Sequence, residues 1–63
     1  MTPTDLRDWR KSMRLSQAEA AALLSVGLRT FNRWEAGEVA IPGPVPLACS
    51  ALRVDLRPWP YTR

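Results

Sequence analysis

The sequence predicts an all-α fold, a compact domain of four short helices followed by an irregular tail. Three observations lead to this prediction. Apolar residues recur at helical spacing, capping signals precede two of the segments, and glycines and prolines separate the segments. With 63 residues the chain can form one domain at most, close to the lower size limit for independent folding.

The first helix is predicted over residues 3–13. Thr2 is its expected N-cap and Pro3 its first helical residue, while Asp5 lies three positions after the cap, a pattern that marks a helix start. An apolar stripe follows at helical spacing: Leu6, Trp9 and Met13.

The second helix is predicted over residues 17–24. Ser16 and Glu19 form a capping box at its start. The alanines of QAEAAALL favour a helix and keep it thin, so another helix can cross it at close range. After the short turn SVG, a third helix is predicted over residues 28–36, and Gly37 ends it.

The prolines and glycine of IPGPVP predict a loop that leads into a fourth helix over residues 44–52. Four apolar residues form its expected buried face: Leu47, Ala48, Ala51 and Leu52. Cys49 is expected to be a small buried residue of the same helix. Residues 1–53 thus form the domain, and residues 54–63 form a tail in which Pro58 and Pro60 stop regular structure.

Composition argues against several classes of function. The chain has no His and a single Cys, so we expect no metal site, no disulfide and no cofactor. Without a paired acid cluster or a Gly-rich phosphate loop there is no catalytic set, and we expect no enzyme. No apolar run approaches the roughly 20 residues of a membrane helix, and the first residues are too polar for a signal peptide. The expected location is the cytoplasm.

The position of the charges is more informative than the net charge of +3. Phe31 and Trp34 lie about 60° apart on one side of the third helix and are interpreted as core. An arc of about 140° on the other side holds four residues: Leu28, Arg29, Asn32 and Arg33. Arg29 and Arg33 are four positions apart, where like charges repel. This pattern alone fits a solvated face as well as an anion site.

The order of the elements is that of a helix-turn-helix arrangement: a capped helix, a three-residue turn and a helix with a cationic outer face. The segment LSQAEAAALLSVGLRTFNRWEAG, residues 15–37, closely resembles the Xre/Cro group of phage-repressor-like helix-turn-helix proteins. The matching residues are Leu-Ser-Gln at the start of the second helix, Ala21, Leu24, Val26 and Trp-Glu-x-Gly at the end. The resemblance implies a lambda-repressor-like domain truncated from five helices to four.

The resemblance also implies that the third helix lies in the major groove of double-stranded DNA. Five residues then occupy base-reading positions: Gly27, Leu28, Arg29, Asn32 and Arg33. Arg29 and Arg33 can each bind guanine O6 and N7, which provides about 1–3 kcal/mol of discrimination. Leu28 can contact a thymine methyl, and Asn32 can bind adenine or a phosphate. The alternatives are phosphate contact for the two arginines and solvation for Asn32.

Three residues near helix starts occupy the phosphate-binding positions that the resemblance implies: Ser16, Gln17 and Thr30. For Gln17 the alternative is a neutral surface position. The segment EVAIPGPVP lacks the basic residues that often follow the third helix in the family. We therefore expect fewer phosphate contacts and a shallower salt dependence of DNA binding.

The resemblance assigns structural roles as well. Arg10 and Glu35 match positions at which the family commonly holds a partly buried ion pair between the first and third helices. Ser25 stands where the family commonly has glycine, so it must accept the backbone geometry of the turn. Gly27 stands where Ser or Thr is common, so it caps the third helix without a hydroxyl.

The chain is too short for the fifth helix that many related proteins use to dimerise. One domain with two base-reading arginines would bind a half-site weakly, so we expect a homodimer on a palindromic operator, with its recognition helices about 34 Å apart. The expected interface consists of six apolar residues: Leu47, Leu52, Val54, Leu56, Trp59 and Tyr61. In the alternatives, Trp59 and Tyr61 pack on their own monomer, or the tail contacts the DNA minor groove through Arg57 and Arg63.

The sequence thus predicts a DNA-binding transcriptional regulator, in particular a repressor of bacterial, phage or mobile-element origin that acts at the nucleoid and controls its own operon. The rival prediction is a protein-interaction module with the same fold, such as an antitoxin that binds a partner protein. The cationic face of Arg29 and Arg33 favours DNA. We expect no pocket for a small-molecule inducer in so small a helical domain.

Overall fold

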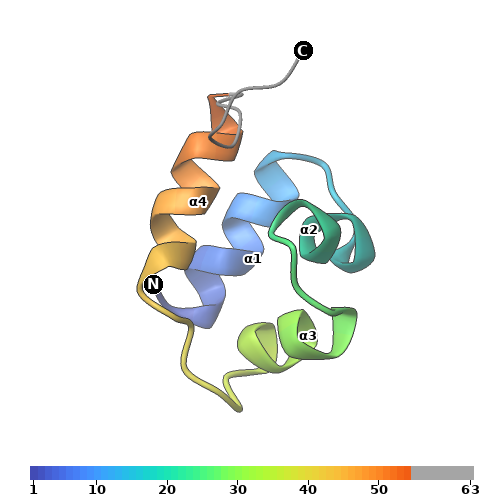
Figure 1. Cartoon of the computed structure of the whole chain (residues 1–63), viewed down its shortest axis with the longest axis vertical. Coiled ribbons are helices and arrows are strands. Elements are labelled where there is room, and N and C mark those ends of the chain that lie inside the picture. The colour runs from blue at the N-terminus through green and yellow to red at the C-terminus, as the bar shows by residue number, and fades with distance from the viewer. Residues whose placement is uncertain (55–63) are drawn as a thin grey trace.

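The computed structural model describes residues 1–54 (Figure 1). Over this range the protein is all-α, as predicted, with four helices and no strand: α1 (Pro3–Ser12), α2 (Gln17–Leu23), α3 (Leu28–Ala36) and α4 (Pro44–Arg53). The helix boundaries differ from the predicted ones by one residue at most. Helix α1 crosses the centre of the molecule, with α4 on one side of it and α2 on the other (Figure 1).

Capping boxes start α1 and α2, as the sequence predicts. Thr2 Oγ1 accepts a hydrogen bond from the backbone N–H of Asp5 at 3.1 Å, and Asp5 Oδ2 accepts one from the backbone N–H of Thr2 at 2.9 Å. Ser16 and Glu19 make the same reciprocal pair, at 3.1 and 2.8 Å. Each box satisfies backbone N–H groups that have no partner within the helix.

The core contains residues from all four helices: Leu6, Trp9, Ala20, Ala21, Phe31, Trp34, Val45 and Cys49. Phe31 and Leu6 are fully buried at its centre. The rings of Phe31 and Trp34 pack against each other with their centroids 6.4 Å apart, which confirms the interpretation of both as core. Ala20 and Ala21 are the buried residues of α2, and their small side chains allow α3 to pack closely on it.

The buried face of α4 differs from the predicted one. Val45 and Cys49 are buried and Leu52 is partly buried, whereas the side chain of Leu47 is 75% exposed. Leu47 was therefore wrongly predicted to be buried, while the buried position of Cys49 is confirmed. The reason is the helical period, because positions i, i+4 and i+7 share one side of a helix and Val45 sets that side here.

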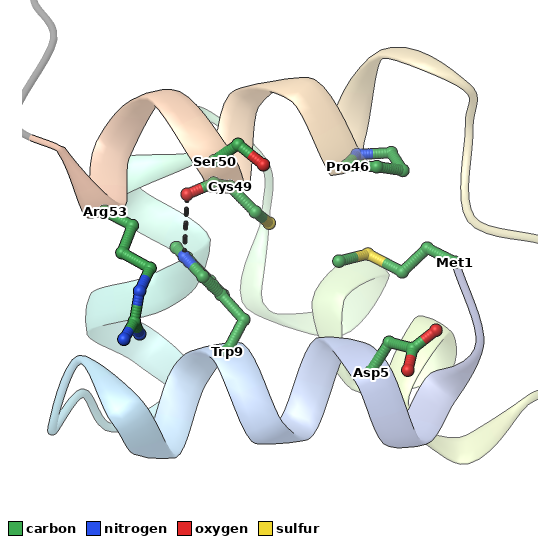
Figure 2. Close-up of a pocket in the computed structure, with 7 residues that line it drawn as sticks. All are labelled: Met1, Asp5, Trp9, Pro46, Cys49, Ser50 and Arg53. Carbon is green, nitrogen blue, oxygen red and sulfur yellow. Dashed lines mark hydrogen bonds between the residues drawn. The ribbon is translucent and has the colours of Figure 1, made fainter.

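Two hydrogen bonds connect α1 to α4. The indole Nε1 of Trp9 donates to the backbone carbonyl of Cys49 at 3.0 Å (Figure 2). Arg53 Nη1 donates to Ser12 Oγ at 2.6 Å. Both join residues about 40 positions apart in the sequence, so they fix the fourth helix on the first.

The turn between α2 and α3 contains a strained residue. Ser25 has φ 59°, in the left-handed region that glycine adopts without a steric penalty. The turn is closed by the N–H of Ser25 on the carbonyl of Ala22 at 3.1 Å, and by that of Val26 on Ala21 at 2.9 Å. Ser25 thus accepts the turn geometry that the sequence analysis anticipated.

Replacing Ser25 with glycine should stabilise the protein. A non-glycine residue in the left-handed region costs about 1–2 kcal/mol, part of which the greater backbone entropy of unfolded glycine offsets, so we expect a gain of about 0.5–1 kcal/mol. Urea unfolding followed by circular dichroism measures this difference. The matched control is Ser50→Gly within α4, which should lower the free energy of unfolding, since glycine disfavours a helix interior. A Ser25→Gly variant less stable than the parent would contradict this account.

Candidate nucleic-acid interface

Glu35, a buried residue of α3, is the centre of a polar network on the side of α3 that faces α1 and α2. Its side chain is 4% exposed. Its Oε2 accepts a hydrogen bond from Arg10 Nε at 2.8 Å, and its Oε1 accepts one from Arg10 Nη2 at 3.3 Å, so the two residues expected to form an ion pair do so. Gln17 Nε2 also donates to Oε1 of Glu35, at 2.8 Å. We call Arg10, Gln17 and Glu35 the Glu35 network; it joins α1, α2 and α3.

Two further hydrogen bonds complete this region. Arg7 Nη2 donates to the backbone carbonyl of Glu35 at 3.3 Å, and Arg10 Nη1 donates to the carbonyl of Leu15 at 3.2 Å. Neither the role of Arg7 nor the bond between Gln17 and Glu35 was predicted from the sequence. The one available signal was that Arg7 lies one turn before Arg10, where two residues of α1 share a face.

The electrostatics of the network keep Glu35 charged. Burial by itself would raise the pKa of Glu35, but the hydrogen bonds from Arg10 and Gln17 and the positive charges of Arg10 and Arg7 outweigh burial and hold it below 4.5. Glu35 is the sole acidic residue of α3, and it is buried and paired. The exposed charges of α3 are therefore both positive.

Those two charges are Arg29 and Arg33. Both side chains are exposed, and within residues 1–54 neither guanidinium has a hydrogen-bond or ion-pair partner. The other expected base-reading residues, Gly27, Leu28 and Asn32, are also exposed, Leu28 by 47%. The structure thus gathers all five on the solvent side of α3 and its start, opposite Phe31 and Trp34.

The three expected phosphate-binding residues have different surroundings. Thr30 is exposed in the first turn of α3. Ser16 is exposed, and its hydroxyl already accepts the capping hydrogen bond, which leaves its O–H free to donate. The amide nitrogen of Gln17 donates to Glu35, so one of its two N–H groups remains for an outside acceptor. Gln17 is thus an exposed residue whose amide is only partly free to donate to an outside group.

The expected dimer interface is only partly within the described residues. Leu47 and Val54 are 75% and 65% exposed and lie two turns apart on one side of α4. Leu52 packs against the core on a different side of the helix, so the structure does not bring it together with them. The remaining three residues, Leu56, Trp59 and Tyr61, lie outside the described residues, as do the tail arginines, Arg57 and Arg63.

Comparison of the chain with protein-family models, with curated proteins and with solved structures finds no match. Among residues 1–54, no helix has the length and apolar character needed to cross a membrane. The same part of the chain contains no group of three His, Cys, Asp or Glu side chains placed to hold a metal ion.

Stability should fall in acid. The pKa values of Asp5, Glu19 and Glu35 are all lowered: the first two by the hydrogen bonds of the capping boxes, the third by the Glu35 network. A carboxyl whose pKa is lowered in the folded state stabilises the protein at pH values above its ordinary pKa, which is 3.8 for Asp and 4.5 for Glu. That contribution disappears as the pH falls through the folded-state pKa. Urea unfolding at a series of pH values should therefore give a constant free energy above about pH 5.5 and a decrease below about pH 4.5.

The matched control for this pH dependence is Glu19→Gln, which keeps a capping-box acceptor but cannot titrate. Its decrease in acid should be smaller than that of the parent protein. A parent protein more stable at pH 3 than at pH 6 would contradict the prediction.

Proposed function

We propose that the protein is a sequence-specific regulator of transcription that binds double-stranded DNA through a helix-turn-helix. The observation that carries the proposal is the charge separation on α3. Arg29 and Arg33 are exposed one turn apart without partners in residues 1–54, whereas Glu35 of the same helix is buried and paired. Two unpaired like charges repel each other, and a polyanion relieves that repulsion.

The arrangement of α2 and α3 supports the same proposal. The two helices pack against each other and are separated by the short segment 24–27, with its left-handed Ser25. A second helix that presents its outer face beyond such a turn is the geometry that enters a major groove. The resemblance to the Xre/Cro group, with four helices in place of five, rests on the residues of LSQAEAAALLSVGLRTFNRWEAG.

In the proposed complex α3 lies in the major groove. Arg29 and Arg33 bind guanine O6 and N7, while Leu28 contacts a thymine methyl and Asn32 an adenine. Phosphates are bound by the hydroxyls of Ser16 and Thr30, and by the remaining N–H of Gln17. The backbone at Gly27 begins α3 without a side chain, so it can approach the DNA closely.

The active species in this proposal is a homodimer on an inverted repeat, since one domain with two base-reading arginines binds a half-site weakly. The exposed side chains of Leu47 and Val54 offer an apolar contact between two α4 helices. They lie on a different helix from the DNA-binding face, so both surfaces can be used at once. A repressor of its own operon in a bacterial or phage setting is the regulator that we propose.

Selection from random duplex DNA at low salt tests this function. We expect recovery of a palindromic site that Arg33→Ala no longer enriches, while Lys11→Ala, which removes an exposed cation from α1, still enriches it. Binding to the recovered site should weaken with rising salt, because phosphate contacts release counterions. Failure to enrich any sequence at low salt would rule out the proposal.

A second candidate is a protein-interaction module, such as an antitoxin. The observation in its favour is the exposed apolar pair Leu47 and Val54, which a partner protein could cover instead of a second copy. Sedimentation separates the two. A dimer that Leu47→Lys converts to a monomer supports the regulator, whereas a monomeric parent protein that enriches no DNA supports the interaction module.

A further inference from the structure

A groove of about 310 Å³ lies between α1 and α4, on a part of the molecule that the proposed DNA contacts do not use (Figure 2). Its apolar wall is formed by Met1, Trp9, Pro46 and Cys49. Figure 2 shows the side chain of Met1 reaching towards α4, and the indole of Trp9 pointing into the same space. Within residues 1–54 the groove is open to solvent along one side. It was not predicted from the sequence.

The two helices that form the groove run in the same direction. Trp9 Nε1 donates to the carbonyl of Cys49, and Arg53 Nη1 donates to Ser12 Oγ, so successive turns of α1 lie beside successive turns of α4. Figure 2 shows both helices beginning at the same end of the groove. The positive ends of both helix dipoles therefore lie at that end, and the negative ends lie at the other.

The two ends of the groove also carry side chains of opposite charge. Asp5 lines the end where the helices begin, and Arg53 lines the other end (Figure 2). Neither forms an ion pair within residues 1–54. Asp5 accepts a hydrogen bond from the backbone of Thr2, and Arg53 donates one to the hydroxyl of Ser12. Both charges are therefore available to a partner that supplies the opposite sign at each end.

The separation of the two charges corresponds to two turns of a helix. Arg53 is bonded to Ser12, which follows Asp5 by seven positions in α1. Seven residues of an α-helix rise about 10.5 Å. Side chains seven positions apart lie on the same side of a helix, so one face of a partner helix can present a charge to each end of the groove.

We propose that this groove binds an amphipathic helix of another protein, antiparallel to α1 and α4. An acidic side chain near the start of the partner helix pairs with Arg53, and a basic side chain seven positions later pairs with Asp5. The apolar side chains between them enter the groove against Trp9 and Met1. This direction also suits the partner's own dipole, because acidic residues stabilise the start of a helix and basic residues its end. The inference does not depend on the proposed DNA-binding function.

The shape of the groove favours such a helix over other occupants. A second copy that used the same groove would place one concave surface against another, and the unfilled space would prevent close packing. A small molecule in an open groove would keep much of its surface in water, unlike a ligand in a typical pocket. A helix is convex and fills a groove with the side chains of one face. Leu47 and Val54 do not line the groove and remain for contact between copies.

Selection from a displayed library of helical peptides tests the inference. Peptides of about 18 residues, long enough to form a helix, are randomised at positions i, i+3, i+4 and i+7 of one face. They are selected on the full-length protein without DNA, so the result is independent of the proposed regulatory function. We expect an acidic residue at i, apolar residues at i+3 and i+4, and a basic residue at i+7. No retained peptide, the reverse order of charges, or no charge preference would each overturn the inference.

Two exposed positions of α4 provide matched variants that locate the bound peptide. Ser50→Glu places a charge on the groove, one turn before Arg53, keeps a good helix former and removes no side-chain hydrogen bond within residues 1–54. The selected peptide should bind this variant at least about 10-fold more weakly, as measured by fluorescence anisotropy. Leu47→Glu introduces the same side chain on the same helix outside the groove and should bind the peptide as the parent protein does.

Two results with these variants would contradict the assignment. A peptide that binds Ser50→Glu as tightly as the parent protein occupies another surface. If sedimentation shows that Ser50→Glu, but not Leu47→Glu, converts a dimer to a monomer, a second copy occupies the groove. Either result overturns the inference.

An uncharged replacement of Asp5 tests the direction of the bound helix. Asp5→Asn keeps a side-chain oxygen that can accept the capping hydrogen bond from Thr2 but removes the charge. The selected peptide should bind it about 2- to 5-fold more weakly, the contribution of an exposed ion pair. A peptide with Gln at i+7 should bind Asp5→Asn and the parent protein equally, since the pair is already absent. If the selected peptide binds both proteins equally, its basic residue does not lie at Asp5 and the proposed orientation is wrong.

Discussion

An Arg33→Ala variant should lose specific binding to the selected operator while folding normally. A bidentate contact with guanine provides about 1–3 kcal/mol of discrimination, which corresponds to a decrease in affinity of about 5- to 150-fold. Arg33 has no partner within residues 1–54, so its removal should leave the free energy of unfolding within about 0.5 kcal/mol of the parent value. Fluorescence anisotropy with a labelled duplex measures the affinity, and urea unfolding measures the stability.

The same experiment distinguishes base contact from phosphate contact. If Arg33 binds a base, substitutions at one operator position should weaken the parent protein but not Arg33→Ala. If it binds a phosphate, affinity should fall equally for all sequences, and the slope of log K against log salt should decrease by about one. Arg29→Ala should behave in the same way at a different operator position. An Arg33→Ala variant that binds as tightly as Lys11→Ala would contradict a role of Arg33 in DNA binding.

Replacement of Glu35 by alanine should have the largest effect on stability. The substitution leaves the guanidinium of Arg10 and the side-chain amide of Gln17 without the carboxylate that accepts their hydrogen bonds. Removing only one partner of a buried ion pair costs about 3–5 kcal/mol of folding free energy. A domain below about 70 residues seldom has a free energy of unfolding above 3–5 kcal/mol, so much of the variant should be unfolded at 25 °C. Circular dichroism at 222 nm should show the loss of helix.

The control replaces both partners of the pair. Arg10→Met with Glu35→Leu removes the two charges together and should recover much of the lost stability, since apolar residues of similar volume can replace a buried ion pair. The coupling between the two positions follows from a double-mutant cycle. If Glu35→Ala lowers the free energy of unfolding by less than about 1 kcal/mol, the Glu35 network contributes no more than a surface ion pair does.

The elements that the sequence predicted correctly are those specified by local signals. The capping residues of α1 and α2 determine where those helices begin, and Gly37, with φ 76°, ends α3 as expected. The face of α4 was predicted wrongly at Leu47, because the apolar residues of PVPLACSAL allow more than one face and only packing on α1 selects Val45 and Cys49. A nearly continuous apolar segment does not specify its own orientation.

The candidate site was predictable to a similar extent. The exposure of Arg29 and Arg33 follows from helical period once Phe31 and Trp34 are assigned to the core. The pairing of Arg10 with Glu35 came from the family resemblance, because the two residues are 25 positions apart and no spacing rule connects them. The bond from Gln17 to Glu35 was missed for the same reason, since it exists only when α2 docks on α3.

The burial of Glu35 has a consequence for how this protein could diversify. The residues that hold α3 in place and the residues that project from it are separate sets, and the second set makes no side-chain hydrogen bond to the rest of residues 1–54. Substitutions at the outer positions of α3 can therefore accumulate with little effect on folding. A library varied at these positions alone should yield folded proteins, and under the proposed function these should differ in operator preference without compensating changes in the core.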